Sequence, residues 1–184
     1  MIPGILARRY ARALIELADS PTARDTYGRD LASFATATRA SDGLGSTVGS
    51  ILSTERYPES QRKALVRSLC ERMRLDPTVR KFLDYVFDRG RIAGVEQMSR
   101  FYAEMADELA RRVHVEVTSA RPLTTVSTGK IHNALERATG RSVVMETAVD
   151  PELIGGIVAR VAGTVIDGSV RKSLQNLRTA LRGE

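Results

Sequence analysis

The hydrophobic residues of this chain change their spacing once, close to residue 112. Up to about residue 105 they recur every three or four positions, which is typical of amphipathic helices. Val113, Val115 and Val117 then alternate with polar residues, which indicates a half-buried strand. The change predicts a mainly α protein with a small α+β part. We expect an N-terminal six-helix bundle over residues 1–105, then a small C-terminal α/β domain with a hairpin and a terminal helix over residues 106–184.

Six helices are predicted in the first domain from apolar stripes and from start and stop signals. Ser20-Pro21 and Asp76-Pro77 are typical helix starts, because a capping side chain precedes a first-turn proline. Gly90 is a typical helix end. At about 1.5 Å per residue the sixth helix would be roughly 30 Å long, enough to reach the second domain. The predicted ranges are about 5–18, 21–40, 44–52, 59–73, 77–89 and 92–112.

The first helix has two apolar strips. Small residues form the narrower strip, and they either face a partner or simply favour helix formation. The wider strip contains Leu6, Tyr10, Ala13, Leu14 and Leu17, and the narrower one contains Ala7, Ala11 and Ala18.

The second domain is predicted to begin with a strand, a helix and a second strand. The helix presents Ile131, Leu135 and Ala138 on one face and ends before Gly140. The second strand spans residues 142–149. Because these apolar faces are small, we expect a small core that a partner stabilises.

A hairpin and a helix are predicted to complete the chain. Gly155-Gly156 permits positive φ or a close backbone approach before an alternating strand of Ile157, Ala159 and Val161. Gly163-Thr164 is expected to reverse the chain into Val165-Ile166. Asp167 or Ser169 then caps the last helix. Its apolar stripe consists of Val170, Leu174, Leu177 and Leu181.

The net charge of +6 raises the possibility of a small basic nucleic-acid-binding protein. The charges are dispersed, however, with 17 basic and 13 acidic residues in positions 1–105 and 11 and 9 in the remainder. Aromatic residues make up 5% of the chain and tryptophan is absent, so few rings are available to stack on bases. We therefore favour a mixed-sign solvated surface over nucleic-acid binding.

The chain carries no motif for catalysis, nucleotide binding or metal binding. Gly155-Gly156 precedes a strand, so it cannot direct a helix N-terminus at phosphate. His114 and His132 lack neighbours at ligand spacing, and the single cysteine, Cys70, lies in an apolar helical stripe. Without a signal peptide or a long apolar run, the chain is expected to be soluble and intracellular. We expect no catalytic residue, cofactor or metal.

Four separated segments together resemble one family. They are Ala7–Leu14 (A-R-R-Y-A-R-A-L), Arg89–Arg91, Val117–Thr124, and a C-terminal signature containing Ile154–Gly156, Ile166–Arg171 and the spaced leucines. As a set they resemble the delta subunit of bacterial F-type ATP synthases, the oligomycin-sensitivity-conferring protein family. The chain departs from the family pattern at Ala159 and Ala162, where larger apolar residues and glycine are usual.

The resemblance implies a non-catalytic subunit of the peripheral stalk, present once in each complex. It implies that residues 1–105 bind the catalytic head and that residues 106–184 bind the b subunits. It further implies a location on the cytoplasmic side of the bacterial plasma membrane, with only indirect membrane contact.

The resemblance also implies two sets of site residues. An N-terminal helix of an alpha subunit would dock between the first and fifth helices. In the alternative interpretation, Tyr10 and Ala13 belong to the core of the bundle. The expected groove lining is Ala7, Tyr10, Ala13, Val79 and Tyr85. The b-binding or structural signature is Gly155, Gly156, Asp167, Gly168, Ser169, Leu174 and Leu177.

Overall fold

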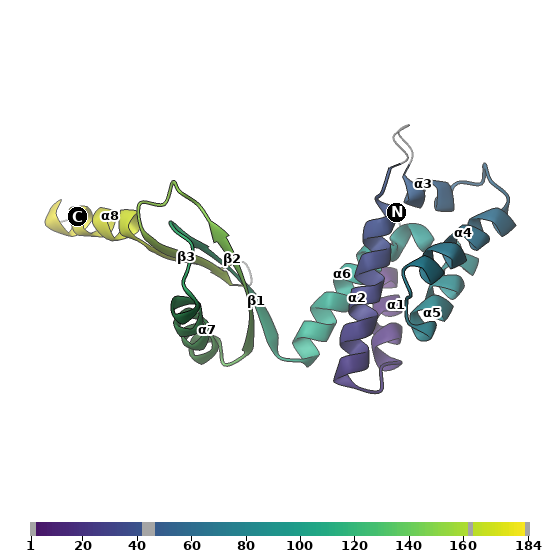
Figure 1. Ribbon diagram of the computed structural model, residues 1–184, viewed down its shortest axis with the longest axis horizontal. Coiled ribbons are helices and arrows are strands. Elements are labelled where there is room, and N and C mark those ends of the chain that lie inside the picture. The colour runs from purple at the N-terminus through teal and green to yellow at the C-terminus, as the bar shows by residue number, and fades with distance from the viewer. Residues whose placement is uncertain (1–2, 42–46, 162–163, 183–184) are drawn as a thin grey trace. The chain divides into compact units, whose positions relative to one another are not determined.

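The computed structural model describes residues 3–41, 47–161 and 164–182 (Figure 1). Within them it contains eight α-helices and one four-stranded sheet, which confirms a mainly α protein with a small α+β part. The chain divides into two compact units, Met1–Ala110 and Arg111–Glu184. The predicted boundary at residue 105 lies inside the last helix of the first unit.

The first unit consists of helices that follow the predicted order. Ser20 Oγ accepts a hydrogen bond from the Ala23 amide at 3.1 Å, and Asp76 Oδ1 accepts one from the Thr78 amide at 2.7 Å. Both predicted caps are therefore present. The helices are α1 (Gly4–Glu16), α2 (Pro21–Thr38), α3 (Val48–Ser53), α4 (Glu59–Arg72), α5 (Pro77–Asp88) and α6 (Val95–Leu109), and the 3-10 turn η1 (Ile92–Gly94) precedes α6.

Two helix predictions need correction. The third helix begins at Val48, where Thr47 caps it through the Ser50 amide, and part of its predicted range, residues 44–46, lies outside the described residues. The predicted long sixth helix is wrong at both ends. Its first residues form the 3-10 turn η1, and it ends at Leu109, before Arg111 adopts a left-handed φ of 49°. At about 1.5 Å per residue, α6 is roughly 22 Å long.

The core of the first unit forms mainly where α1 and α2 pack on α6. Tyr102 of α6 is almost fully buried and donates its hydroxyl to the Arg24 carbonyl at 2.8 Å. Gly28 leaves room for this ring, since a Cβ there would lie 3.1 Å from the Tyr102 Cε1 atom. This packing is favourable because the Tyr102 ring is buried while its hydroxyl keeps a hydrogen-bond partner.

The second unit contains a sheet with strand order β2-β1-β3-β4. β1 pairs in parallel with β2 and antiparallel with β3, and β3 forms an antiparallel hairpin with β4. The alternating prediction for Val113, Val115 and Val117 is confirmed, because all three are buried. Residues 162 and 163, in the predicted hairpin turn, lie outside the described residues. The elements are β1 (Arg112–Ser119), α7 (Thr125–Thr139), β2 (Ser142–Val149), β3 (Gly156–Val161), β4 (Thr164–Ser169) and α8 (Val170–Arg182).

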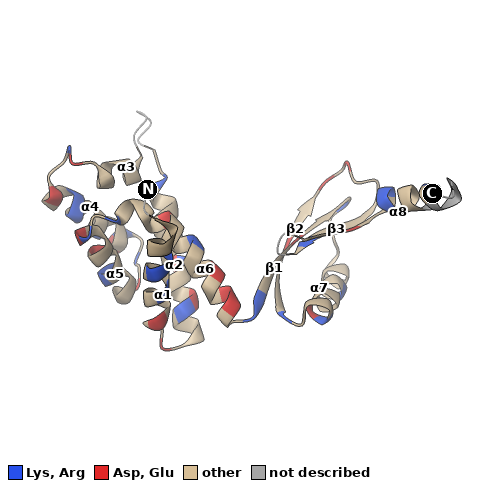
Figure 2. Ribbon diagram, turned by 180° about the vertical axis from the view of Figure 1, so that it is seen from behind, with Lys and Arg blue, Asp and Glu red and all other residues tan. Residues whose placement is uncertain are grey.

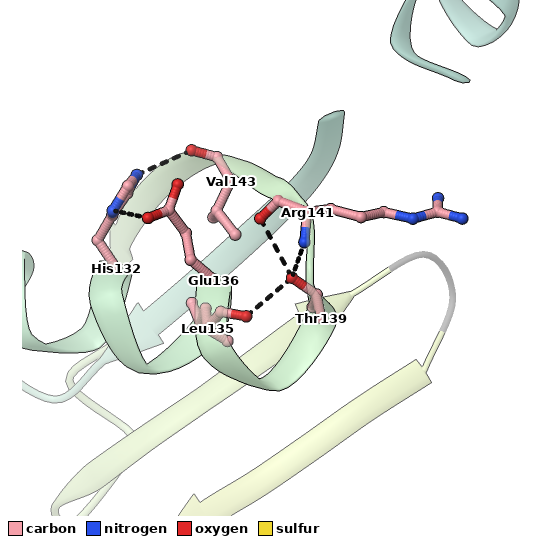
Figure 3. A network of polar contacts seen from close by, with 6 residues as sticks. All are labelled: His132, Leu135, Glu136, Thr139, Arg141 and Val143. Carbon is pink, nitrogen blue, oxygen red and sulfur yellow. Dashed lines mark hydrogen bonds and ion pairs between the residues drawn. The ribbon is translucent and has the colours of Figure 1, made fainter. Parts of the chain in front are cut away.

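One hydrogen bond, from the middle of α7, joins this helix to β2, and further polar contacts close its C-terminal end (Figure 3). The Nε2 atom of His132 donates a hydrogen bond to the Val143 carbonyl at 3.0 Å, and Nδ1 lies 3.7 Å from a Glu136 carboxylate oxygen. Thr139 donates its hydroxyl to the Leu135 carbonyl at 2.8 Å, and Gly140 ends the helix at a φ of 63°. His132 therefore has a structural role between helix and sheet.

The core of the second unit is small. Its buried apolar residues come from β1, β2, β3 and the inner face of α7. Among the described residues this core has six buried members, against 23 in the first unit, so less apolar burial stabilises it. The six are Val113, Val115, Val117, Leu135, Val143 and Ala159.

Gly156 is a position where the backbone requires glycine. Its φ is 83°, and an added Cβ would lie 2.3 Å from the Gly168 carbonyl oxygen. We expect Gly156→Ala to lower the free energy of unfolding of the second unit by roughly 3 kcal/mol or more, from backbone strain and steric overlap. Urea unfolding followed by far-UV circular dichroism measures the loss.

Gly129 provides the matched control for this substitution. It lies exposed within α7 with nothing near its hypothetical Cβ, so Gly129→Ala should stabilise the unit by roughly 0.5–1 kcal/mol. All five tyrosines lie between residues 1 and 110, so near-UV tyrosine signals report only on the first unit and should not change. Equal urea midpoints for the two variants would contradict the steric argument.

Candidate partner-binding sites

A groove of about 770 Å³ lies between α1 and α5 on the first unit. Apolar and aromatic side chains form much of its surface, and basic side chains contribute the rest. α1 contributes Leu6, Arg9, Tyr10, Ala13 and Leu17; α5 contributes Thr78, Lys81, Phe82 and Tyr85; and the segment after α5 contributes Arg89 and Arg91.

The groove exists because the core uses only part of the apolar surface of α1. Ala7 and Ala11 are fully buried, so the small-residue strip belongs to the core. Tyr10 and Leu14 are also buried, whereas Ala13 is exposed and Leu17 is 54% exposed. Of the two alternatives for the alanine strip, the one in which Ala7 and Ala11 face a partner is therefore wrong.

The wall of the groove is built from aromatic rings held by arginines. The Tyr10 ring centroid lies 6.3 Å from those of both Phe82 and Tyr85. Arg91 lies 5.5 Å from the Tyr10 ring centroid and donates a hydrogen bond to its hydroxyl. Arg89 lies 5.0 Å from the ring centroid of Tyr85, a residue that is 49% exposed. These cation–π contacts orient the rings and leave apolar area open to solvent.

The five residues predicted to line the groove divide into two groups. Tyr10, Ala13 and Tyr85 do line it. Ala7 and Val79 are fully buried and belong to the core, so they offer no surface to a partner. The prediction missed Leu6, Leu17 and Phe82, although helical spacing from Tyr10, Ala13 and Tyr85 pointed to them.

The signature residues of the second unit shape the junction between the hairpin and α8. The Asp167 carboxylate accepts a hydrogen bond from the Ser169 amide at 2.9 Å, and hydrogen bonding to Ser169 lowers the pKa of Asp167. Ser169 Oγ accepts from the Lys172 amide at 3.2 Å, so Ser169 caps α8. Gly156 permits the close passage of Gly168 described above. These residues position α8 rather than present reactive groups.

An apolar surface remains exposed around α8. Leu174 is 56% exposed, which excludes it from the small core, and Val170 and Ile166 are also exposed. The Gly155 carbonyl accepts a hydrogen bond from the Val170 amide at 3.0 Å, which fixes the start of this helix. The side chain of Leu177 lies outside the described residues.

The polar side of α8 is positively charged. Its sequence between Val170 and Arg182 contains Arg171, Lys172 and Arg178 but no acidic residue, and Figure 2 shows basic residues alone among the charged positions drawn there. The helix is therefore a basic amphipathic one. Such a helix is suited to an apolar partner with acidic flanks.

Other features among the described residues give no second kind of site. No group of three or more His, Cys, Asp or Glu residues within residues 3–41, 47–161 and 164–182 could hold a metal ion. None of the helices described there is long and apolar enough to cross a membrane.

An open groove on the first unit and an exposed amphipathic helix on the second are features of the binding class of proteins. The sequence model of the ATP synthase delta (OSCP) subunit family matches residues 6–181. The chain belongs to this family, and it is a non-catalytic peripheral-stalk component of an ATP synthase.

Individual relatives agree with this assignment. Proteins named ATP synthase subunit delta from Geobacter metallireducens and Anaeromyxobacter dehalogenans are 34% and 35% identical to the chain over 182 residues. Each comparison covers 99% of this chain and 99% of the relative. The resemblance inferred from the four motifs is thus confirmed, and nucleic-acid binding receives no support.

The fold is also similar to a chain in the cryo-EM structure of the mitochondrial ATP synthase hexamer of Toxoplasma gondii. The TM-score is 0.59 at 20% sequence identity, over 96% of this chain and 97% of that chain. At this identity the likeness concerns the fold.

Cys70 should be unreactive in the folded protein. Burial in α4, with a smaller effect from the Asp84 carboxylate, raises the pKa of its thiol to about 11, so the reactive thiolate is scarce at pH 8. An unfolded cysteine has a pKa of about 8.5, and we expect a thiol reagent to modify unfolded protein at least ~100-fold faster than native protein at pH 8. Rapid labelling of native protein, measured by mass spectrometry, would contradict the buried position.

Proposed function

We propose that the two units join different parts of the ATP synthase. The first unit, a six-helix bundle, binds the catalytic head by docking an N-terminal alpha-subunit helix in the α1–α5 groove. The second unit binds the distal end of the b subunits through α8 and its surroundings. The observation that carries the proposal is the open groove, whose apolar lining the core leaves uncovered.

The groove suits an amphipathic helix. Ala13 is a small exposed residue at its edge, so a foreign backbone can approach closely there. Leu17 and Tyr85 supply apolar area beside it, and the tyrosine adds a hydroxyl that hydrogen-bonds. Docking buries this surface, and aromatic side chains at the centre of such interfaces often dominate the binding energy.

The second unit suits an elongated partner. Val170 and Leu174 lie one helical turn apart on α8, and both are exposed. A parallel coiled coil of b subunits would cover this stripe and add apolar burial to a unit with a small core.

Two attachments on one chain explain how a non-catalytic subunit resists rotation. Once one unit is bound, the other meets its partner at a raised effective concentration, so moderate contacts combine into firm attachment. One copy, held on the cytoplasmic side of the bacterial plasma membrane through its partners, thus links the head to the membrane-anchored b subunits. Rotor torque is then used for ATP synthesis.

Ala13→Asp tests the groove. In the free protein the carboxylate stays solvated, so the free energy of unfolding should change by less than about 1 kcal/mol. In the complex it would be partly desolvated against the apolar stripe of the docked helix, and a loss of about 3 kcal/mol weakens binding roughly a hundredfold. Calorimetric titration with an alpha-subunit N-terminal peptide measures this change.

Ala11→Asp is the matched control on the same helix. Ala11 is fully buried, so this variant should lose several kcal/mol of stability, on the order of the cost of an unpaired buried charge. Thermal melts of both variants separate a groove residue from a core residue. Unchanged peptide affinity in Ala13→Asp would refute docking in this groove.

Leu174→Asp tests the second surface. Leu174 is 56% exposed, so its replacement should change stability by less than about 1 kcal/mol, while binding to a fragment from the C-terminal end of the b subunits weakens at least tenfold. Binding of the alpha peptide should persist. The control is Asn176→Asp, which places the same carboxylate at an exposed position on another face of α8 and should leave the affinities for the alpha peptide and the b fragment unchanged. If Leu174→Asp weakens binding of the alpha peptide and the b fragment equally, the two surfaces are not separate.

A further inference from the structure

Among the residues that the structure describes, four basic and no acidic side chains line the α1–α5 groove. Arg9 comes from α1, Lys81 from α5, and Arg89 and Arg91 from the turn that follows α5. Arg9, Lys81 and Arg89 are exposed, and Arg91 is partly buried against Tyr10. The apolar floor is thus bordered by positive charge.

Several acidic residues of the same unit already pair with cations outside the groove. Lys63 lies 2.5 Å from Asp88, Arg67 lies 3.4 Å from Asp84, and Arg39 pairs with Glu96. Asp84 and Asp88 belong to α5, yet they pair with cations of α4 and do not line the groove. Within the described part of the chain, no carboxylate forms an ion pair with Arg9, Lys81, Arg89 or Arg91.

Two of the four cations are held in place by the groove wall itself. Arg89 lies over the Tyr85 ring and Arg91 over the Tyr10 ring. A cation stacked on a ring keeps its remaining N–H groups available, and guanidinium groups bind carboxylates in a paired geometry. Arg89 is exposed and can therefore meet a carboxylate without first leaving the ring.

We propose that the groove is selective for an amphipathic helix whose apolar stripe is flanked by Asp and Glu. This inference rests on the proposed docking function and adds the chemistry of the occupant. Complementary charge at the rim guides encounter and rejects helices with basic flanks, because like charges would then face each other. The exposed ring of Tyr85 and the side chains of Ala13 and Leu17 meet the apolar stripe.

Three designed helical peptides test the selectivity against the full chain. They share one apolar stripe and differ only in flanking residues, which are Glu, Gln or Lys. In calorimetric titrations at ~50 mM salt we expect the Glu peptide to bind about tenfold more tightly than the Gln peptide, and the Lys peptide most weakly. At ~500 mM salt the Glu advantage should shrink to about twofold, because screening weakens exposed pairs.

Variants assign the effect to the groove. Lys81→Gln and Arg9→Gln should each weaken the Glu peptide about three- to fivefold and leave the Gln peptide unchanged, as expected for single exposed charge pairs. Arg72→Gln removes an exposed arginine of α4 that does not line the groove and should have no effect. Thermal melts confirm that all three variants fold.

The outcomes separate this inference from the docking function. Equal affinities of the Glu and Gln peptides, or tighter binding of the Lys peptide, overturn the acidic preference. If an alpha-subunit N-terminal peptide still binds and Ala13→Asp abolishes that binding, the docking function stands without the charge selectivity. If neither the alpha-subunit peptide nor the designed peptides bind, both are overturned.

Discussion

The packing of α1 against α6 is the constraint on which the first unit depends. Ala7 and Ala11 of α1 are fully buried, and α1 packs more extensively on α6 than on any other described helix. With this strip committed to the core, Ala13 and Leu17 face outward beside α5. The groove is thus a direct consequence of how the core is formed, since Ala13 and Leu17 remain exposed among the described residues.

The second unit also leaves apolar surface exposed, and its core is smaller. Six buried residues among those described form its core. The backbone of Gly168 lies close to Gly156, and this contact determines where the hairpin ends and α8 starts. Leu174 is then left outside. Both units therefore retain apolar surface that folding does not bury. Exposing that surface to water costs free energy, and binding to a partner removes this cost.

A stalk protein needs firm attachment rather than reactivity. The chemical groups of this chain are used accordingly: His132 fastens α7 to β2, Asp167 and Ser169 cap a helix, and Cys70 fills a core. The groove between α1 and α5 differs, because basic residues border exposed apolar surface there and no described acidic residue lines it. In a protein whose work is binding, positive charge beside exposed apolar surface is the most informative feature of the surface.

Local patterns in the sequence were enough to predict most elements. The caps at Ser20 and Asp76, the alternation of β1 and the family motifs depend on residues close together in the chain. Tertiary packing alone decided that Ala7 and Val79 belong to the core and that Leu174 stays exposed. The physical reason is that helical spacing defines how wide an apolar face is, whereas neighbours distant in sequence determine which part of that face is covered.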